Sequence, residues 1–105
     1  MNKHERVVEL DVRPHLKKKL EPFKLIMDAV TALEPEDLFI LHAPFKPTPL
    51  FGVMKVKGYS HREEQIEAGY WIVAFAREVH VQWGHLELSQ FKKRDEEEEV
   101  AHDEP

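Results

Sequence analysis

Cysteine is absent from this chain of 105 residues, which excludes disulfides, thiolate metal sites and thiol nucleophiles together. Glycine is scarce, and none of the four glycines belongs to a glycine-rich loop that would cradle a phosphate. No apolar run approaches the roughly 20 residues that cross a bilayer. The first residues also lack the apolar segment of a secretory signal. We therefore expect a cytoplasmic protein that does not enter a membrane.

The net charge of −5 comes from one end of the chain. Removing the seven acidic residues of 95–105 from the total of 20 leaves 13 acids against 15 bases, so the remainder is close to neutral. A run of like charges repels itself and has nothing to bury. We expect residues 6–91 to form a single domain and residues 92–105 to form a charged, disordered tail. Solubility is the favoured role of that tail, and binding a basic partner is the alternative.

The first half of the chain predicts a strand, a helix and a second strand. Residues 7–12 alternate between apolar and polar side chains, which is typical of a half-buried strand. Pro22 suits the first turn of a helix, where its missing N–H is not needed. Apolar residues then repeat at helical spacing along one stripe: Phe23, Ile26, Met27, Val30 and Leu33. The wholly apolar run 38–41 indicates an interior strand.

The next segment predicts a helix and a hairpin. Thr48 can cap the helix with Pro49 at its first position, and Leu50, Val53 and Met54 would form the buried stripe. Gly58 stands where a helix commonly ends. Residues 59–66 are mostly polar, which is typical of an edge strand protected by charge. A turn at 67–69 then leads into a strand with Trp71, Val73 and Phe75 on one face.

The resulting order, β-α-β-α-β-β, predicts an α/β (α+β) two-layer sandwich, in which two helices cover one face of a four-stranded mixed sheet. The alternation continues through Val79, Val81 and Trp83 before Gly84 breaks it. Either the fourth strand is longer, or an extra C-terminal strand follows. An exposed apolar strand needs a cover. Packing on its own domain is favoured, and a protein partner or a homodimer, formed by strand pairing or arm exchange, is the alternative.

Several motifs occur in an order that resembles a family of small, uncharacterised prokaryotic domains in the TusA/SirA-like superfamily. The resemblance covers roughly residues 8–77, and the residues that carry it are Leu10-Asp11-Val12-Arg13-Pro14, Leu33 to Leu41, Pro44-Phe45-Lys46-Pro47-Thr48-Pro49-Leu50, Gly58-Tyr59 and the closing hairpin. It implies the same β-α-β-α-β-β sandwich.

The wider superfamily resembles sulfur carriers, which open the first helix with a Cys-Pro-x-Pro motif. In such carriers the helix dipole favours the thiolate that receives the persulfide. Counting back from Pro35, the last proline of the motif corresponds to Pro22 and the cysteine position to Lys19. Lysine cannot carry a persulfide. The sequence therefore disfavours sulfur transfer and predicts a protein that is not an enzyme.

Seven histidines are scattered along the chain without the spacing of a metal motif, and solvated histidines are the favoured interpretation. The best functional candidates are His15, in the loop after the first strand, and His42, as the chain leaves the second strand. Loops at this end of an α/β sandwich often bind ligands. A metal- or redox-associated accessory domain that uses these two histidines is therefore the alternative function. No resident cofactor is predicted.

Arg13, Lys17, Lys18 and Lys19 form a basic cluster near a helix N-terminus, where anions and phosphate groups bind well. The domain is nearly neutral, and no aromatic stacking motif accompanies the lysines. A solvated connector is therefore favoured, and nucleic-acid binding through Lys17–Lys19 is the weaker alternative.

The prolines of the loop 44–49 restrict its backbone, and Phe45 lies at its middle. Phe45 can fill the core, which is favoured, or it can lie exposed as a docking point. We expect a non-enzymatic binding or adaptor module. Its predicted contacts are this loop and the strand region 78–83, with the interaction residues Phe45, Val79, Val81 and Trp83.

Overall fold

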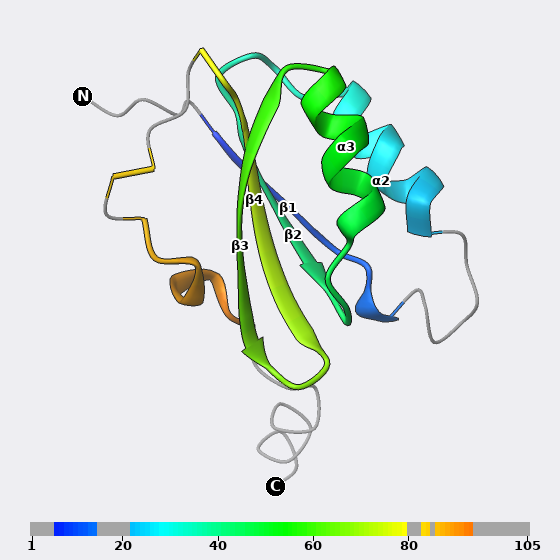
Figure 1. The fold of residues 1–105 in the computed structure, drawn as a ribbon, viewed down its shortest axis with the longest axis vertical. Coiled ribbons are helices and arrows are strands. Elements are labelled where there is room, and N and C mark those ends of the chain that lie inside the picture. Colours follow the sequence, from blue (N-terminus) through cyan, green and yellow to red (C-terminus); the bar gives the residue numbers. More distant parts are fainter. Residues whose placement is uncertain (1–5, 15–21, 80–82, 85, 94–105) are drawn as a thin grey trace, which may run out of the picture.

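The computed structural model describes residues 6–14, 22–79, 83–84 and 86–93. In this part of the chain, four strands form one sheet in the order β1-β2-β4-β3 (Figure 1). The strands are β1 (Val7–Asp11), β2 (Leu38–Ala43), β3 (Tyr59–Glu67) and β4 (Tyr70–Arg77). β1 is parallel to β2, whereas β4 is antiparallel to both β2 and β3. The predicted four-stranded mixed sheet is therefore confirmed.

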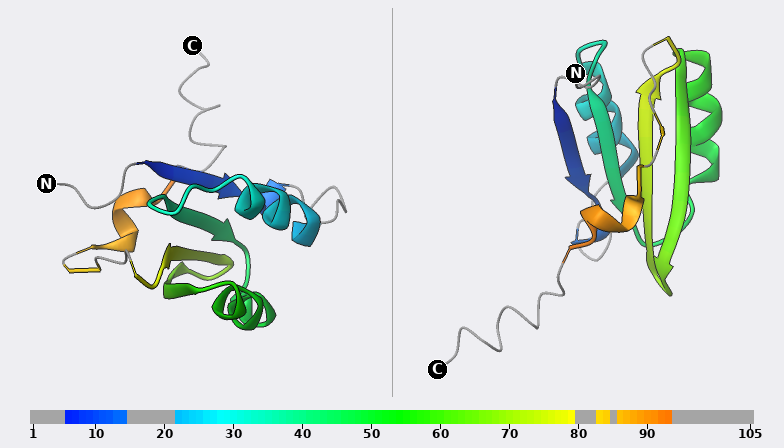
Figure 2. Two further views of the ribbon diagram at one scale, coloured as in Figure 1. Left: turned by 90° about the horizontal axis from the view of Figure 1, so that it is seen from above. Right: turned by 90° about the vertical axis from the view of Figure 1, so that its left-hand side faces the viewer.

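Helices α2 (Pro22–Thr31) and α3 (Thr48–Val56) cover one face of the sheet, as predicted (Figure 2). In α2, Pro22 is the first residue, and Ile26 and Val30 are buried. Phe23 was expected on the same buried stripe, but it is 48% exposed. It lies in the first turn of α2, and it is not one of the described residues that pack in the helix-side cluster.

The start of α3 differs from the prediction in one detail. Pro47 precedes the helix, Thr48 lies within it, and no side chain caps it. Leu50 and Met54 are buried against the sheet, as expected. Gly58 ends the turn after α3 with a φ of 95°, a left-handed conformation that glycine adopts without steric cost.

The sheet separates two apolar clusters because strand residues alternate between its faces. On the helix side, α2 and α3 pack on residues of β2 and β4 that include Phe39, Leu41, Val73 and Phe75. On the opposite side lie Leu38, Ile40, Ile72, Ala74 and Ala76. All six residues of β2 are buried, as expected for an interior strand. β3 is the charged edge strand that the sequence predicted.

The second face is covered by the end of the chain, which we call the C-terminal arm (residues 83–84 and 86–93). Its residues Leu88–Phe91 form the short 3-10 helix η1, on the side opposite to α2 and α3 (Figure 2). Leu88 is 1% exposed, and the partly buried Trp83, Leu86 and Phe91 pack against the same cluster. The arm thus makes this face part of the interior.

The predicted continuation of the fourth strand is not observed. β4 ends at Arg77, residues 78–79 form a turn, and the described residues contain no fifth strand. Val79 follows the end of β4 and is 83% exposed. Val81 lies outside the described residues. Trp83 packs on its own domain, which was the favoured expectation. It does so from the irregular part of the arm, before the 3-10 helix η1.

Within the described residues, no helix is long and apolar enough to cross a membrane.

Candidate functional site

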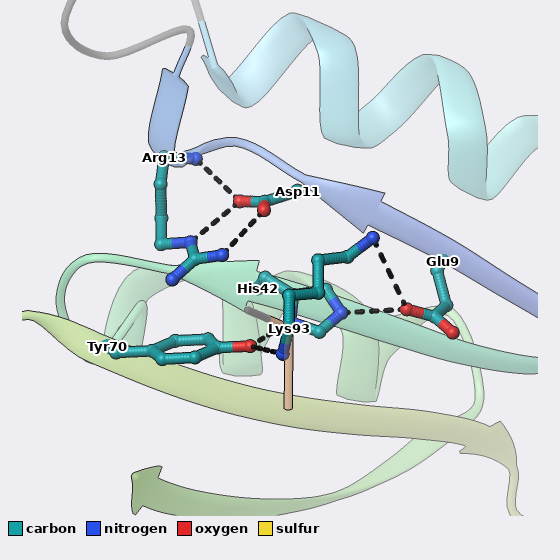
Figure 3. Close-up of polar contacts among 6 residues, drawn as sticks. All are labelled: Glu9, Asp11, Arg13, His42, Tyr70 and Lys93. Atoms are coloured by element: carbon teal, nitrogen blue, oxygen red, sulfur yellow. Dashed lines mark hydrogen bonds and ion pairs between the residues drawn. The ribbon is translucent and has the colours of Figure 1, made fainter. Parts of the chain in front are cut away.

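A group of polar side chains lies on the arm side of the sheet, near the ends of β1 and β2. We call it the His42 cluster, and its members are Glu9, Asp11, Arg13, His42, Tyr70 and Lys93 (Figure 3). Strand alternation explains its composition: Asp11 pairs with His42 in the register of β1 and β2, and Glu9 lies two residues earlier on the same face. His42 was expected where the chain leaves the second strand. It lies within β2 instead and is fully buried.

The contacts of His42 determine where its proton lies. Its Nε2 is 2.9 Å from Glu9 Oε1, and its Nδ1 is 2.9 Å from Tyr70 Oη. A carboxylate only accepts hydrogen bonds, so Nε2 of the neutral ring carries the hydrogen and donates to Glu9. Nδ1 then accepts a hydrogen bond from the hydroxyl of Tyr70. The same hydroxyl oxygen accepts a hydrogen bond from the backbone N–H of Lys93, at 2.8 Å.

The electrostatics of the cluster favour this neutral arrangement. Burial lowers the pKa of His42 below its ordinary value of 6.5, although the hydrogen bond to Glu9 and the charges of Asp11 and Glu9 act in the opposite direction. Burial also raises the pKa of Tyr70, which keeps its hydroxyl protonated. At neutral pH a continuous chain of hydrogen bonds therefore joins β1, β2, β4 and the arm.

Arg13, a predicted anion-binding residue, has intramolecular contacts instead. Its Nε and Nη2 donate to the two carboxylate oxygens of Asp11, at 2.9 and 2.7 Å. Its guanidinium carbon also lies 3.8 Å from the centre of the Tyr70 ring, in cation–π geometry. Burial acts to raise the pKa of Asp11, but the hydrogen bonds from Arg13 outweigh burial and lower it. The other predicted basic residues, Lys17, Lys18 and Lys19, lie outside the described residues.

His42 and Tyr70 are placed to hold the strands and the arm together, and their polar atoms are closed to a substrate. His42 and Tyr70 are 0% and 2% exposed, so solutes do not reach their polar atoms. Both ring nitrogens of His42 already have protein partners. In the described part of the chain, no three His, Asp or Glu residues are grouped so that they could hold a metal ion. His15, the other predicted ligand, lies outside the described residues.

A second site lies on the helix side, in the loop between β2 and α3. Phe45 was expected in the core, but it is 51% exposed, while the neighbouring Pro47 is buried. The backbone N–H of Thr48 donates to the carbonyl of Lys46 at 2.9 Å, which tightens the loop. The loop therefore presents an aromatic side chain on a restrained backbone.

Charged and aromatic side chains surround this loop. Lys46 Nζ lies 2.9 Å from Glu63 Oε2 and 5.9 Å from the centre of the Trp71 ring. Beside Glu63, the ring of His61 stacks on Phe51, with centres 3.9 Å apart. We call the set Phe45, Lys46, His61, Glu63 and Trp71 the loop surface. Its charged side chains are paired, and its aromatic side chains are partly accessible.

Comparison with family models assigns the part of the chain that forms the sheet and its two helices to a known family. A model described as Uncharacterized conserved protein (DUF2249) matches residues 9–77. The chain belongs to this family. The match starts within β1 and ends with β4, so the arm of this DUF2249 domain lies beyond the matched residues. Comparisons with curated proteins and with solved structures found no match.

Sequence reasoning found His42 and Arg13 in this DUF2249 domain but missed Glu9, Asp11, Tyr70 and Lys93. Lys93 had been assigned to the charged tail, yet its backbone bonds to Tyr70. One signal was available: Leu86, Leu88 and Phe91 lie beyond Gly84, and such apolar residues need a surface to cover. That surface is the face of the sheet to which Glu9 and His42 belong.

Proposed function

We propose that this DUF2249 domain is a non-enzymatic binding module, and that it docks a partner protein through the loop surface. The single observation that carries the proposal is Phe45, which is half exposed in a loop whose following residues are held by the hydrogen bond from Thr48 to Lys46. An aromatic side chain held in this way loses little conformational entropy when it enters a pocket. We infer that the partner offers an apolar pocket to Phe45.

The surroundings of Phe45 support docking by a protein. Interface centres are enriched in aromatic residues, and their rims are polar. Trp71 supplies a second accessible aromatic side chain, while the Lys46–Glu63 pair supplies a polar rim. Phe23, in the first turn of α2, is a further aromatic side chain that lies exposed, at 48%. These residues would extend the contact beyond one side chain.

Three finer statements remain predictions. The β-α-β-α-β-β order supports membership of the TusA/SirA-like superfamily, and the lack of cysteine argues against sulfur transfer within it. The cytoplasm remains the predicted compartment. Val79, which is 83% exposed at the opposite end of β4 from the loop, remains a predicted second contact for a protein partner or a homodimer.

Site-specific photo-crosslinking tests the proposal. A benzoylphenylalanine residue replaces Phe45 in one variant and Val56 in a matched control, because Val56 is 88% exposed at the C-terminal end of α3. We expect one discrete crosslinked protein from position 45 in the cells of origin and none from position 56. That protein is then purified, and its affinity for the unlabelled domain is measured by calorimetry.

The affinity measurement decides the outcome. Truncating an aromatic anchor typically costs about 2 kcal/mol or more, so Phe45→Ala should weaken binding of the purified partner by about thirtyfold. Val56→Ala should leave the affinity unchanged. Equal crosslinking from both positions, or an affinity that Phe45→Ala does not change, would refute the proposal.

A further inference from the structure

The C-terminal arm is attached to the sheet by two kinds of contact. Leu88 fills an apolar site against β2 and β4 and is 1% exposed. Beyond η1, the backbone N–H of Lys93 donates to Tyr70 Oη at 2.8 Å. Two ion pairs between the arm and the strands are long and exposed to solvent. Lys92 Nζ lies 3.8 Å from Glu67 Oε1, and Lys93 Nζ lies 3.9 Å from Glu9 Oε1. The tyrosine hydroxyl is therefore the specific polar anchor of the arm's end.

This anchor depends on the protonation of His42. With a neutral ring, the Tyr70 hydroxyl donates to Nδ1 and accepts from Lys93. A protonated ring donates from both nitrogens. The Tyr70 oxygen would then face two N–H donors, and its own hydrogen would lose its acceptor. Protonation thus leaves the Tyr70 hydrogen without its acceptor and makes the Lys93 N–H share the Tyr70 oxygen with a second donor, which weakens the hold on Lys93.

The charged and titratable groups around His42 come from every element packed against it. From β1, the carboxylates of Glu9 and Asp11 favour the charged ring. From the arm, the ammonium of Lys93 disfavours it. Tyr70 of β4 contributes a neutral hydroxyl, and Arg13 lies over the Tyr70 ring with its charge paired to Asp11. A fully buried ring at 0% exposure adds the cost of removing its charge from water.

We propose that the C-terminal arm is a pH-dependent cover: protonation of His42 detaches the arm at Tyr70 and exposes the apolar face of the sheet that the arm covers. The uncovered residues include Leu38, Ile40 and Ile72, which lie under the arm at neutral pH. This device is independent of the loop surface, which lies on the helix side. A docked arm is the closed state, and mild acid raises the fraction of molecules in the open state.

The linkage between proton binding to His42 and release of the arm sets how strongly the open fraction depends on pH. When the arm leaves, His42 gains water and its pKa returns towards the ordinary value of 6.5, so the open state binds a proton more readily. Between pH 7.5 and 5.5, a group with that pKa goes from largely neutral to largely charged. If the closed state excludes the proton over this range, the fraction of open molecules rises by about tenfold.

Hydrogen–deuterium exchange of the full chain tests this proposal. Protection factors, corrected for intrinsic exchange rates, are measured at pH 7.5 and 5.5 for peptides from the arm and from β4. We expect arm protection to lie below β4 protection at both pH values, because the arm opens while the sheet stays closed, and to fall by as much as about tenfold from pH 7.5 to 5.5. Unchanged arm protection would overturn the proposal. Equal protection of arm and β4 peptides would also overturn it, because both would then exchange through opening of the whole domain.

Two variants identify the titrating group. In His42→Gln, which cannot take up a proton, the pH dependence of arm protection should disappear. Replacing the surface histidine in His61→Gln is the matched control and should leave it unchanged. Persistence of the pH dependence in His42→Gln would assign it to another group and refute the proposal.

A fluorescence measurement covers the case in which His42→Gln does not fold. The sequence has two tryptophans, so Trp71→Phe leaves Trp83 of the arm as the sole reporter. Trp83 packs against the covered face, so its emission should shift to longer wavelength between pH 7.5 and 5.5. Adding Tyr70→Phe should produce the shifted emission already at pH 7.5. An emission that is insensitive to both changes would contradict release of the arm.

Discussion

Replacing Tyr70 by phenylalanine tests whether the His42 cluster stabilises the domain through one hydroxyl group. The ring keeps its packing and its contact with Arg13, so the change removes only the oxygen that joins Lys93 to His42. Nδ1 of His42 is then left without a donor inside a fully buried site. The Lys93 N–H lies on an exposed residue and can bond to water instead.

The expected loss follows from these two environments. A buried polar atom without a partner costs about 1–3 kcal/mol, and a hydrogen bond that water replaces costs about 0.5–1 kcal/mol. We therefore expect Tyr70→Phe to lower the free energy of unfolding by about 2 kcal/mol. For a small domain, that lowers the urea midpoint by about 1 M.

Urea unfolding followed by circular dichroism at pH 7.5 measures this loss, with Tyr59→Phe as the matched control. Tyr59 is 8% exposed on the helix side of the sheet, and within the described residues its hydroxyl forms no hydrogen bond. The control should stay within about 0.5 kcal/mol of the parent protein. Equal stabilities for the two variants would show that the Tyr70 hydroxyl does not anchor the arm, and the reasoning would fail.

Three further substitutions or conditions test other parts of the structure. Leu88→Ala should lower the free energy of unfolding by about 2–4 kcal/mol and increase binding of a hydrophobic dye, because the shorter side chain leaves the buried site under the arm unfilled. Unchanged stability would contradict the burial of Leu88. Asp37→Ala should lower the free energy of unfolding by about 2 kcal/mol, because the 1% exposed carboxylate accepts hydrogen bonds from the exposed Arg6 and from the backbone N–H of Glu34. A loss below about 0.5 kcal/mol in urea unfolding would show that this turn is not held by Asp37. Burial lowers the pKa of His42, so the contribution of the neutral ring to stability is complete above the ordinary pKa of 6.5 and is lost as the pH falls through the lowered pKa. Urea unfolding at pH 7.5 and 5.5 should therefore show a smaller loss of stability in His42→Gln than in the parent protein. Equal losses would exclude His42 as the cause.

Most of the fold could be predicted because the sequence pattern and the local turn chemistry agree. The apolar run 38–41 indicated an interior strand, and β2 pairs on both sides and is buried throughout. Pro22 begins α2, Gly58 ends the turn after α3, and the polar residues 59–66 lie on an edge strand. Each of these features is decided by residues close together in the sequence.

The C-terminal region could not be predicted in the same way because its conformation depends on a distant surface. The alternation through Val79 and Trp83 left open a longer fourth strand or an extra C-terminal strand, yet β4 ends at Arg77 and the arm contains only a 3-10 helix among its described residues. The arm lies on a sheet face that strands far apart in the sequence form together. Alternating residues show that two faces exist, but they do not show what covers the second face.

The candidate sites were only partly predictable for the same reason. His42 was singled out for its chemistry, but its two hydrogen-bond partners come from β1 and β4, and the arm joins the cluster through Tyr70. Phe45 was expected in the core because it is apolar and flanked by prolines, whereas the buried member of its loop is Pro47. Residue type indicated which side chains matter, and tertiary packing decided which of them face water.

The mixed sheet also imposes an order on folding. β3 and β4 meet across a tight turn at 68–69, so this hairpin can assemble from neighbouring residues. β1 instead joins β2 in parallel, with Val7 opposite Leu38, which requires a long loop to close before any contact forms. Pairing of β2 with β4 closes a loop of similar length, with Ala43 opposite Trp71. The β3–β4 hairpin is therefore the strand pair that neighbouring residues can form first.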